Sequence, residues 1–201
     1  MKDYNAGSIT VLEGLEAVRV RPGMYIGGVG VKGLNHLIYE IMDNSIDEHL
    51  AGYCKNIWVT LNADGSCTVK DDGRGIPVEM HQKGISAERV VLSTLHAGGK
   101  FGNESYKTSG VNALSNFLDI KVYRDGYIHH DRYEKGVPVI ELKNGLLPTI
   151  GKTRETGTEI TFLPDDTIFE VTRFRVDWLK SRMHESAYLN PGLILHFINN
   201  R

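Results

Sequence analysis

One segment decides the fold of this chain: Leu34-Asn35-His36-Leu37-Ile38-Tyr39-Glu40-Ile41-Met42-Asp43-Asn44-Ser45-Ile46-Asp47-Glu48-His49-Leu50-Ala51. At about 100° per residue its apolar side chains fall on one side of a helix together with Ser45; they are Leu34, Leu37, Ile38, Ile41 and Met42. Gly52 follows and supplies a helix stop. The segment therefore predicts an amphipathic helix over residues 34–51.

The opposite side of this helix is polar and acidic. Glu40, Asn44 and Asp47 stand at positions i, i+4 and i+7 and so share one face. A solvated helix face is one explanation of this pattern. However, Asp43 and Glu48 add further negative charge around the Asn44 amide, and no Lys or Arg stands four residues away to relieve the repulsion. A bound cation would relieve this repulsion. Mg²⁺ is the expected ion, because it prefers oxygen ligands and keeps several waters.

The sequence around this helix alternates between short strands and further helices. Residues 57–61 and 67–70 are predicted strands on either side of Asn62-Ala63-Asp64-Gly65, whose Asp-Gly pair suits a hairpin turn. Further strands are expected at 120–123, 128–133, 137–142, 158–163 and 193–198, and helices at 11–18, 87–96, 111–116 and 173–188. Because hairpins dominate, we expect an α+β fold, a two-layer α/β sandwich with a mixed, largely antiparallel sheet backed by helices.

Composition excludes several classes of protein. The chain has 201 residues, enough for one domain, and its 41% hydrophobic and 24% charged residues are typical of globular proteins. The net charge of −2 and the absence of a basic run do not fit a nucleic-acid binder for this segment alone. Cys54 and Cys67 are not spaced as a metal or redox pair, which favours a reducing compartment. Without a signal-like start or a long apolar run, we expect a cytoplasmic protein with no membrane partner.

Two glycine motifs imitate nucleotide-binding loops. Gly28-Val29-Gly30-Val31-Lys32-Gly33 satisfies the dinucleotide pattern, but only Met24-Tyr25-Ile26 precedes it, too short for a buried parallel strand. Gly151-Lys152-Thr153 imitates the end of a phosphate loop, but Leu146 stands where the first glycine is required. We therefore interpret the first as a turn into the helix and reject the second.

The loop Asp71-Asp72-Gly73-Arg74-Gly75-Ile76-Pro77 directly follows a predicted strand. A tight turn would explain it, since Asp, Gly and Pro are common turn residues. The alternative is a ligand site, because glycines let a flat ligand approach the backbone and a carboxylate there accepts a hydrogen bond from an exocyclic amine. Such a charge-assisted bond contributes about 1.5–3 kcal/mol.

A polar, glycine-rich passage over residues 97–110 contains Gly98-Gly99-Lys100-Phe101. A lysine in a glycine hinge could follow a phosphate, and an ordinary surface loop is the alternative explanation.

Taken in order, these blocks resemble the ATPases of the gyrase, Hsp90, histidine-kinase and MutL superfamily, and within it the ATPase subunits of type II topoisomerases. The resemblance runs through the whole chain and is carried by Val11–Arg19, Arg21–Gly27, Glu40–Glu48, Asp71–Pro77, Leu95–Phe101 and Thr156–Thr158. It leaves open whether the parent is a gyrase or a topoisomerase IV, because the domains that separate supercoiling from decatenation lie beyond residue 201. Two alternatives also stay open: a histidine kinase, for which no phospho-accepting helix is found, and a non-catalytic nucleotide-binding interaction domain.

The resemblance implies a role for each residue of an ATP and Mg²⁺ site. Glu40 is the expected general base that activates the attacking water, and Asn44 is the expected protein ligand of Mg²⁺. Asp71 is the expected adenine anchor, together with a water and the Thr158 hydroxyl. The remaining nucleotide-binding set comprises Glu48 and Gly75, the outer wall Arg74 and Pro77, the apolar adenine slot Ile41, Val69, Ile76, Val91 and Ile160, the lid residue Lys100, and Tyr4, with Ile9, on a dimer-exchange arm over residues 1–10.

The resemblance also exposes departures from the family pattern. Residues 1–201 correspond to the N-terminal ATP-binding domain, with a shortened lid over 97–110 and without the transducer and DNA-interacting domains through which the family meets DNA and the cleavage subunit. The second glycine box, expected between Gly110 and Val111, is missing. Its amides would cradle the triphosphate. We therefore expect an engineered fragment that binds adenine-site inhibitors but hydrolyses ATP poorly, with His130 where relatives often carry an inhibitor-contacting Arg.

Overall fold

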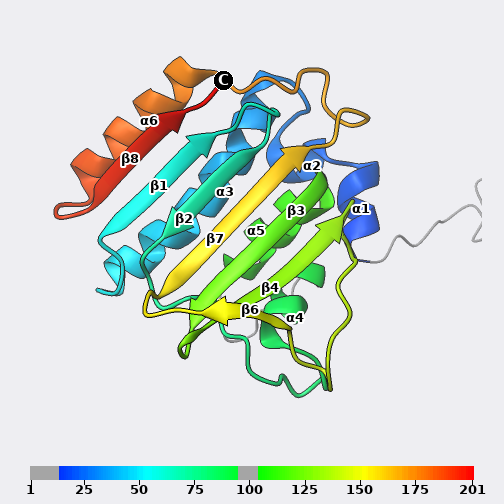
Figure 1. The fold of residues 1–201 in the computed structure, drawn as a ribbon. Coiled ribbons are helices and arrows are strands. Elements are labelled where there is room, and N and C mark those ends of the chain that lie inside the picture. The colour runs from blue at the N-terminus through cyan, green and yellow to red at the C-terminus, as the bar shows by residue number, and fades with distance from the viewer. Residues whose placement is uncertain (1–13, 95–103) are drawn as a thin grey trace, which may run out of the picture.

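The computed structural model describes residues 14–94 and 104–201. Its elements are α1 (Leu15–Val20), α2 (Gly23–Ile26), α3 (Val31–Leu50), β1 (Asn56–Leu61), β2 (Cys67–Asp71), α4 (Ala87–Ser93), α5 (Glu104–Ala113), β3 (Ser115–Arg124), β4 (Tyr127–Glu134), β5 (Val137–Pro138), β6 (Thr149–Lys152), β7 (Gly157–Pro164), α6 (Val176–Leu189) and β8 (Ile194–Asn199), shown in Figure 1.

The strands form one eight-stranded sheet in the order β5-β4-β3-β7-β2-β1-β8, with β6 paired to β4. The β1–β8 pair is parallel and every other pair is antiparallel. Helices α3 and α5 cross behind the sheet (Figure 1). The predicted α+β fold with a mixed, largely antiparallel sheet backed by helices is therefore confirmed.

The core lies between the apolar side of α3 and one face of the sheet. Alternate residues of β1 and β2 are buried, as expected of strands that turn one side to a core. On α3 the predicted apolar positions are buried, and Leu34, Leu37 and Ile38 are fully so. The sheet thus buries one side of α3 and leaves the opposite, polar side outside this core.

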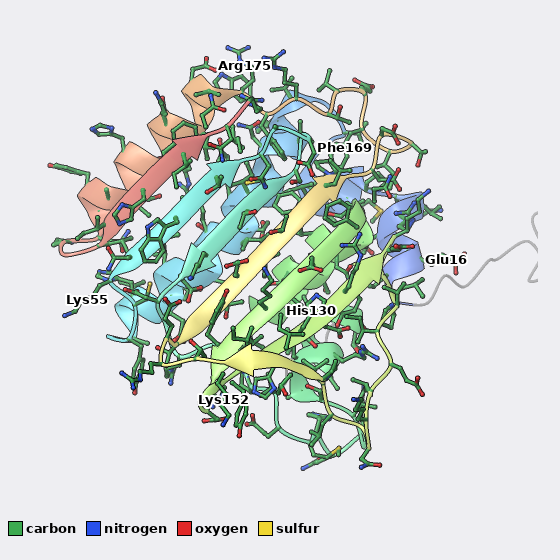
Figure 2. All side chains as sticks on the ribbon, in the orientation of Figure 1. Glu16, Lys55, His130, Lys152, Phe169 and Arg175 are labelled. Carbon is green, nitrogen blue, oxygen red and sulfur yellow. The ribbon has the colours of Figure 1, made fainter. Side chains whose placement is uncertain are left out.

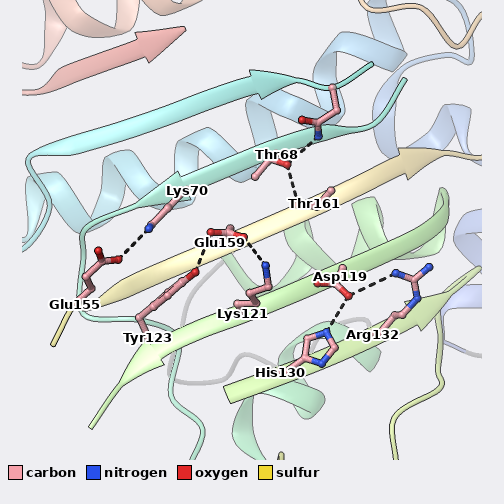
Figure 3. Close-up of polar contacts among 11 residues, drawn as sticks. Thr68, Lys70, Asp119, Lys121, Tyr123, His130, Arg132, Glu155, Glu159 and Thr161 are labelled. Carbon is pink, nitrogen blue, oxygen red and sulfur yellow. Dashed lines mark hydrogen bonds and ion pairs between the residues drawn. The ribbon is translucent and has the colours of Figure 1, made fainter. Parts of the chain in front are cut away.

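The other face of the sheet is open and polar (Figures 2 and 3). Its side chains pair with one another: Lys70 of β2 pairs with Glu155 in the connection before β7, and across strands Glu159 accepts hydrogen bonds from Lys121 and Tyr123. Such cross-strand pairs stabilise a sheet by about 0.2–1 kcal/mol each.

Several predicted elements differ from the observed ones. Helix α1 begins at Leu15 instead of residue 11, although residues 11–13 lie outside the described chain. The expected helix at 111–116 is wrong: α5 runs over Glu104–Ala113, because its buried Thr108, Ser109 and Val111 pack against neighbouring helices despite weak local helix propensity. The expected strand at 137–142 is reduced to β5, which ends at Pro138, a residue without an amide donor.

Both glycine motifs take the structures that were predicted for them. The short helix α2, not a strand, precedes Gly28, and the chain turns directly into α3 after Gly30. Gly33 lies so close to the Gly28 backbone that a Cβ would stand 1.9 Å from the Gly28 carbonyl oxygen. Gly151 and Lys152 belong to strand β6 and form no phosphate loop.

We expect Gly33→Ala to lower the free energy of unfolding by about 1–3 kcal/mol, because the added methyl forces backbone atoms apart. This packing cost should exceed the stabilisation of about 1 kcal/mol that alanine gains over glycine from its higher helix propensity. Urea unfolding checks it, with Gly23→Ala as the control, since a Cβ at Gly23 meets nothing within 4 Å. Equal unfolding midpoints for the two variants would contradict the packing argument.

Candidate functional site

A cavity of about 310 Å³ opens between α3, the loop after β2, α4 and β7. Its walls combine apolar side chains with a few polar groups, the composition typical of small-molecule sites. The lining residues are Ile41, Asn44, Ser45, Glu48, Asp71, Arg74, Gly75, Ile76, Pro77, Ala87, Val91, Thr108, Arg124 and Thr158.

The Asp71 carboxylate is the buried polar group of this cavity. Its Oδ1 accepts hydrogen bonds from the Gly73 amide at 2.9 Å and the Thr158 amide at 3.2 Å, and its Oδ2 accepts one from the Ser45 hydroxyl at 2.8 Å. Each carboxylate oxygen offers about two acceptor positions. Oδ1 is therefore saturated by protein, whereas Oδ2 keeps one position for a donor in the cavity.

Two glycines allow this arrangement. A Cβ at Gly73 would stand 3.0 Å from Asp71 Oδ1, and one at Gly157 would stand 2.0 Å from the Asp71 carbonyl oxygen. Gly157 also has a φ of +138°, which side chains rarely adopt. Gly157 therefore lets β7 come close enough for the Thr158 amide to reach Asp71. The Thr158 hydroxyl accepts a separate hydrogen bond from the Ile76 amide at 3.2 Å.

Burial raises the pKa of Asp71 above its usual value, while the bonds from Ser45, Gly73 and Thr158 lower it and the Glu48 charge raises it. The carboxylate thus depends on its three donors to remain ionised. A ligand donor at Oδ2 would stabilise the ionised form further.

The rim of the cavity is held by two arginines. Arg74 pairs with Glu48 through a 2.6 Å Nη2–Oε1 contact and lies over the Tyr53 ring, and its hydrogen bond lowers the pKa of Glu48. Arg124, at the end of β3, donates to the Gly75 carbonyl oxygen at 2.8 Å. The loop between Arg74 and Pro77 is therefore clamped from both sides.

On the polar side of α3, two oxygens are buried without hydrogen-bond partners among the described residues: Glu40 Oε2 and Asn44 Oδ1. The other Glu40 oxygen lies 2.6 Å from His36 Nε2, and Asn44 Nδ2 donates to the Thr108 hydroxyl. Buried oxygens of this kind normally have partners. A ligand or solvent at this end of the site would satisfy both of them.

The acidic face of α3 finds its counter-charges in other elements. Asp43 pairs with Arg182 of α6 at 3.3 Å, and Glu48 pairs with Arg74. No Lys or Arg stands four residues away along the helix, and the positive partners come from tertiary structure, which local spacing does not reveal.

The donor set fits Mg²⁺. Across residues 14–94 and 104–201 no group of three or more His, Cys, Asp or Glu side chains could form a protein cage for a metal. Mg²⁺ rarely needs such a cage, since it keeps several waters and takes one or two protein oxygens plus substrate phosphates. The unpartnered Asn44 Oδ1 is such an oxygen.

The structure gathers most of the predicted site residues around the cavity; the lining includes Ile41, Asn44, Glu48, Asp71, Arg74, Gly75, Ile76, Pro77, Val91 and Thr158. Glu40 lies one helical turn from Asn44 and does not line it. Val69 and Ile160, expected in the adenine slot, are instead cross-strand partners in the core. Tyr4, Ile9 and Lys100 lie outside the described residues.

Sequence reasoning missed four lining residues: Ser45, Ala87, Thr108 and Arg124. Ser45 could have been identified from the sequence, because it places a hydroxyl on the apolar side of a helix. A buried hydroxyl needs a hydrogen-bond partner. No local pattern marked the other three.

The interpretation of His130 requires correction. His130 lies on the open face of the sheet, where its Nε2 is 2.9 Å from Asp119 Oδ2 (Figure 3). Arg124, six residues earlier, lines the cavity together with Arg74. Arg124 is the last residue of β3, and His130 lies in its antiparallel partner β4. The two residues are therefore close in sequence but lie on different surfaces.

Comparison with known proteins identifies the class. The profile of the family described as "Histidine kinase-, DNA gyrase B-, and HSP90-like ATPase" matches residues 30–168, more than half of the chain. The chain belongs to this family.

Within the family, the chain is similar to DNA gyrase B. It is 52% identical to DNA gyrase B from Thermotoga maritima over 98% of this chain and 32% of the relative. It is also 49% identical to the B subunit of DNA topoisomerase 4 from Enterococcus faecalis, over 99% of this chain and 30% of that protein. The chain therefore spans about a third of the length of these curated relatives.

The fold matches as well. A crystal structure described as the 43K ATPase domain of Thermus thermophilus gyrase B in complex with an aminocoumarin superposes with a TM-score of 0.85 at 44% identity, covering 94% of this chain and 49% of that one. Within the described residues, no helix is long and apolar enough to cross a membrane.

We expect Ser45→Ala to raise the pKa of Asp71 further and to lower the free energy of unfolding by about 1–3 kcal/mol at neutral pH. The loss should shrink as the pH falls through the raised pKa, because a protonated Asp71 no longer needs the hydroxyl donor. Urea unfolding at neutral and acidic pH measures this. Ser93→Ala is the control, since Ser93 Oγ has no hydrogen-bond partner among the described residues; a pH-independent loss for Ser45→Ala would refute the assignment.

Proposed function

We propose that this chain is the ATP-binding domain of a bacterial type II DNA topoisomerase, of the gyrase type, with topoisomerase IV as the alternative. The observation that carries the proposal is the Asp71 carboxylate, buried in an apolar cavity with one acceptor position left at Oδ2. A purine with an exocyclic amine has the matching donor and a flat apolar ring.

The cavity walls suit an adenine ring. Ile41, Ile76 and Val91 provide apolar contacts, and Pro77 extends the wall outward. Asp71 accepts from the exocyclic amine, and Thr158 contributes a hydroxyl whose oxygen is already fixed by the Ile76 amide. The burial that raises the pKa of Asp71 also strengthens a charge-assisted hydrogen bond, since solvent competes little there.

Hydrolysis is assigned to the polar side of α3. We assign Glu40 as the general base that takes a proton from the attacking water, which its unpartnered Oε2 supports. Asn44 Oδ1 would hold Mg²⁺, which neutralises charge on the phosphates when bound. His36, 2.6 Å from the other Glu40 oxygen, orients the base.

The missing glycine box limits this activity. Helix α5 runs through Gly110 and Val111 without a break, so no glycine-rich turn presents amides at that point. The match to DNA gyrase B of Mycolicibacterium smegmatis extends over 209 positions, more than the 201 residues of this chain, which agrees with residues lacking here. We therefore infer binding of adenine-site ligands, including inhibitors, with poor ATP hydrolysis.

In a full-length protein we infer a homodimer formed through the N-terminal arm at residues 1–10, with DNA and the DNA-cleaving subunit contacted by further domains. These inferences rest on the gyrase relatives, which are about three times as long as this chain. A cytoplasmic location follows from the same proposal. A non-catalytic nucleotide-binding domain is the alternative, and ATP hydrolysis after insertion of a glycine-rich segment between Gly110 and Val111 separates the two.

Asp71→Asn should reduce the affinity for adenosine at least tenfold, about the 1.5–3 kcal/mol of a charge-assisted hydrogen bond. Isothermal titration calorimetry measures it. The matched control is Asp119→Asn on the open face of the sheet, where the carboxylate pairs with His130. Unchanged adenosine affinity in Asp71→Asn, with the variant folded, would reject the adenine site.

ATP should bind this chain with an affinity close to that of adenosine, because few amides remain to hold the triphosphate. Insertion of a glycine-rich segment between Gly110 and Val111 should strengthen ATP binding over adenosine and raise hydrolysis. Glu40→Gln in the inserted protein should keep ATP binding and remove hydrolysis, as measured by phosphate release. A Glu40→Gln variant with full hydrolysis would exclude Glu40 as the base.

A further inference from the structure

Helix α4 is fastened to strand β4 by a buried polar cluster that the proposed mechanism does not use. Arg89 forms a bidentate pair with Asp131, with Nη2–Oδ1 at 2.6 Å and Nε–Oδ2 at 2.9 Å, and it also donates to the Ile140 carbonyl oxygen. The Tyr133 hydroxyl lies 2.8 Å from Asp131 Oδ2 and 3.1 Å from Glu88 Oε1. Glu88, Asp131 and Tyr133 are fully buried.

The hydrogen count in this cluster fixes its protonation. Tyr133 has one hydroxyl proton, yet its oxygen lies 2.8 Å from Asp131 Oδ2 and 3.1 Å from Glu88 Oε1, so both contacts can be full two-centre hydrogen bonds only with a second proton. Asp131 is the ionised member, because it accepts two Arg89 bonds and the Arg132 amide at 2.9 Å. The second proton therefore belongs to Glu88, which donates to Tyr133, which in turn donates to Asp131.

The charges agree with this count. Arg89 and Asp131 neutralise each other, so an ionised Glu88 would be a buried charge without compensation. Its Oε2 has no hydrogen-bond partner among the described residues. Burial raises the pKa of Glu88 well above its ordinary value, and the neighbouring Asp131 charge raises it further.

We propose that Glu88 is a positioning residue, a neutral carboxylic acid at neutral pH that ties α4 to β4 through Tyr133 and thereby sets the α4 wall of the nucleotide cavity. The effect of Glu88 on ligand binding rests on the proposed function, whereas its protonation and its tie to β4 do not. Ala87 and Val91 are four residues apart on one side of α4 and line the cavity, whereas Glu88 and Arg89 point to the sheet. A shift of α4 would move the apolar wall directly.

Two further hydrogen bonds hold α4 without a titratable group. The Ser86 hydroxyl donates to the Val78 carbonyl oxygen, and Asn112 of α5 donates to the Leu92 carbonyl oxygen at 2.9 Å. On β4, His129 occupies the same side as Asp131 and Tyr133, and its Nε2 has no hydrogen-bond partner among the described residues. Among residues 14–94 and 104–201, Glu88 is therefore faced by the titratable or charged groups of Arg89, Asp131 and Tyr133, with His129 on the same side of β4.

The direct test is a pH titration of the whole chain labelled with ¹³Cδ-glutamate and followed by NMR. One glutamate resonance should ionise well above the ordinary pKa of about 4.3, and it should be missing in Glu88→Gln. Asp71 does not interfere because aspartate is unlabelled. If Glu88→Gln fails to fold, a shift of the same resonance in Tyr133→Phe assigns it. Titration of every glutamate in the ordinary range would overturn the proposal.

Two comparisons between the wild type and Glu88→Gln test the consequences. The pKa of Glu88 is raised in the folded protein, so the wild type loses stability as the pH rises from the ordinary glutamate pKa to the raised one. Over that range its folding equilibrium constant should fall by about tenfold per pH unit relative to that of Glu88→Gln. All titratable groups other than Glu88 are common to both proteins, so their contributions cancel in the comparison. Parallel pH profiles would overturn the protonation.

Adenosine affinity supplies the readout of positioning. In the wild type it should weaken several-fold as the pH rises through the Glu88 pKa, and in Glu88→Gln it should remain level over that range. A high glutamate pKa with level wild-type affinity would overturn the positioning role. Absence of adenosine binding at every pH would instead refute the proposed function, while the glutamate titration still decides the protonation of Glu88.

Discussion

The burial of one carboxylate, Asp71, organises this domain. Its two oxygens collect a hydroxyl from α3, an amide from its own loop and an amide from β7, so three segments that are distant in sequence converge on it. Burying such a charge costs several kcal/mol unless donors surround it. The glycines at positions 73 and 157 and the short side chain of Ser45 are the local conditions that make this convergence possible.

The same reasoning explains the contrast between the two sides of the sheet. On the helix side, buried polar groups are joined by hydrogen bonds shielded from solvent, as in the Arg89, Asp131, Tyr133 and Glu88 cluster. On the open side, ion pairs such as Lys121–Glu159 remain close to solvent and contribute little individually. The ligand cavity lies at the edge of the helix layer, where buried and solvated polar groups meet.

The backbone of α5 bears on the proposed function of the site more than on the fold. Helix α5 packs against α3 and runs continuously over Glu104–Ala113, so its backbone forms no glycine-rich turn at Gly110 and Val111. The sheet order and the Asp71 contacts do not depend on that turn. Under the proposed function, adenine recognition is therefore separable from triphosphate binding, because different donors would supply the two.

The sequence alone determined the α3 helix, the sandwich class and the loop that carries Asp71, because helix periodicity, strand alternation and turn residues are local properties. It also placed Glu40, Asn44 and Asp71 in one site through a resemblance of ordered motifs. Only the tertiary structure decided that Arg124 and not His130 reaches the cavity, that Val69 and Ile160 belong to the core, and that Arg182 relieves the acidic face of α3. Each of these depends on strand register or on contacts between elements far apart in the chain, which no local pattern encodes.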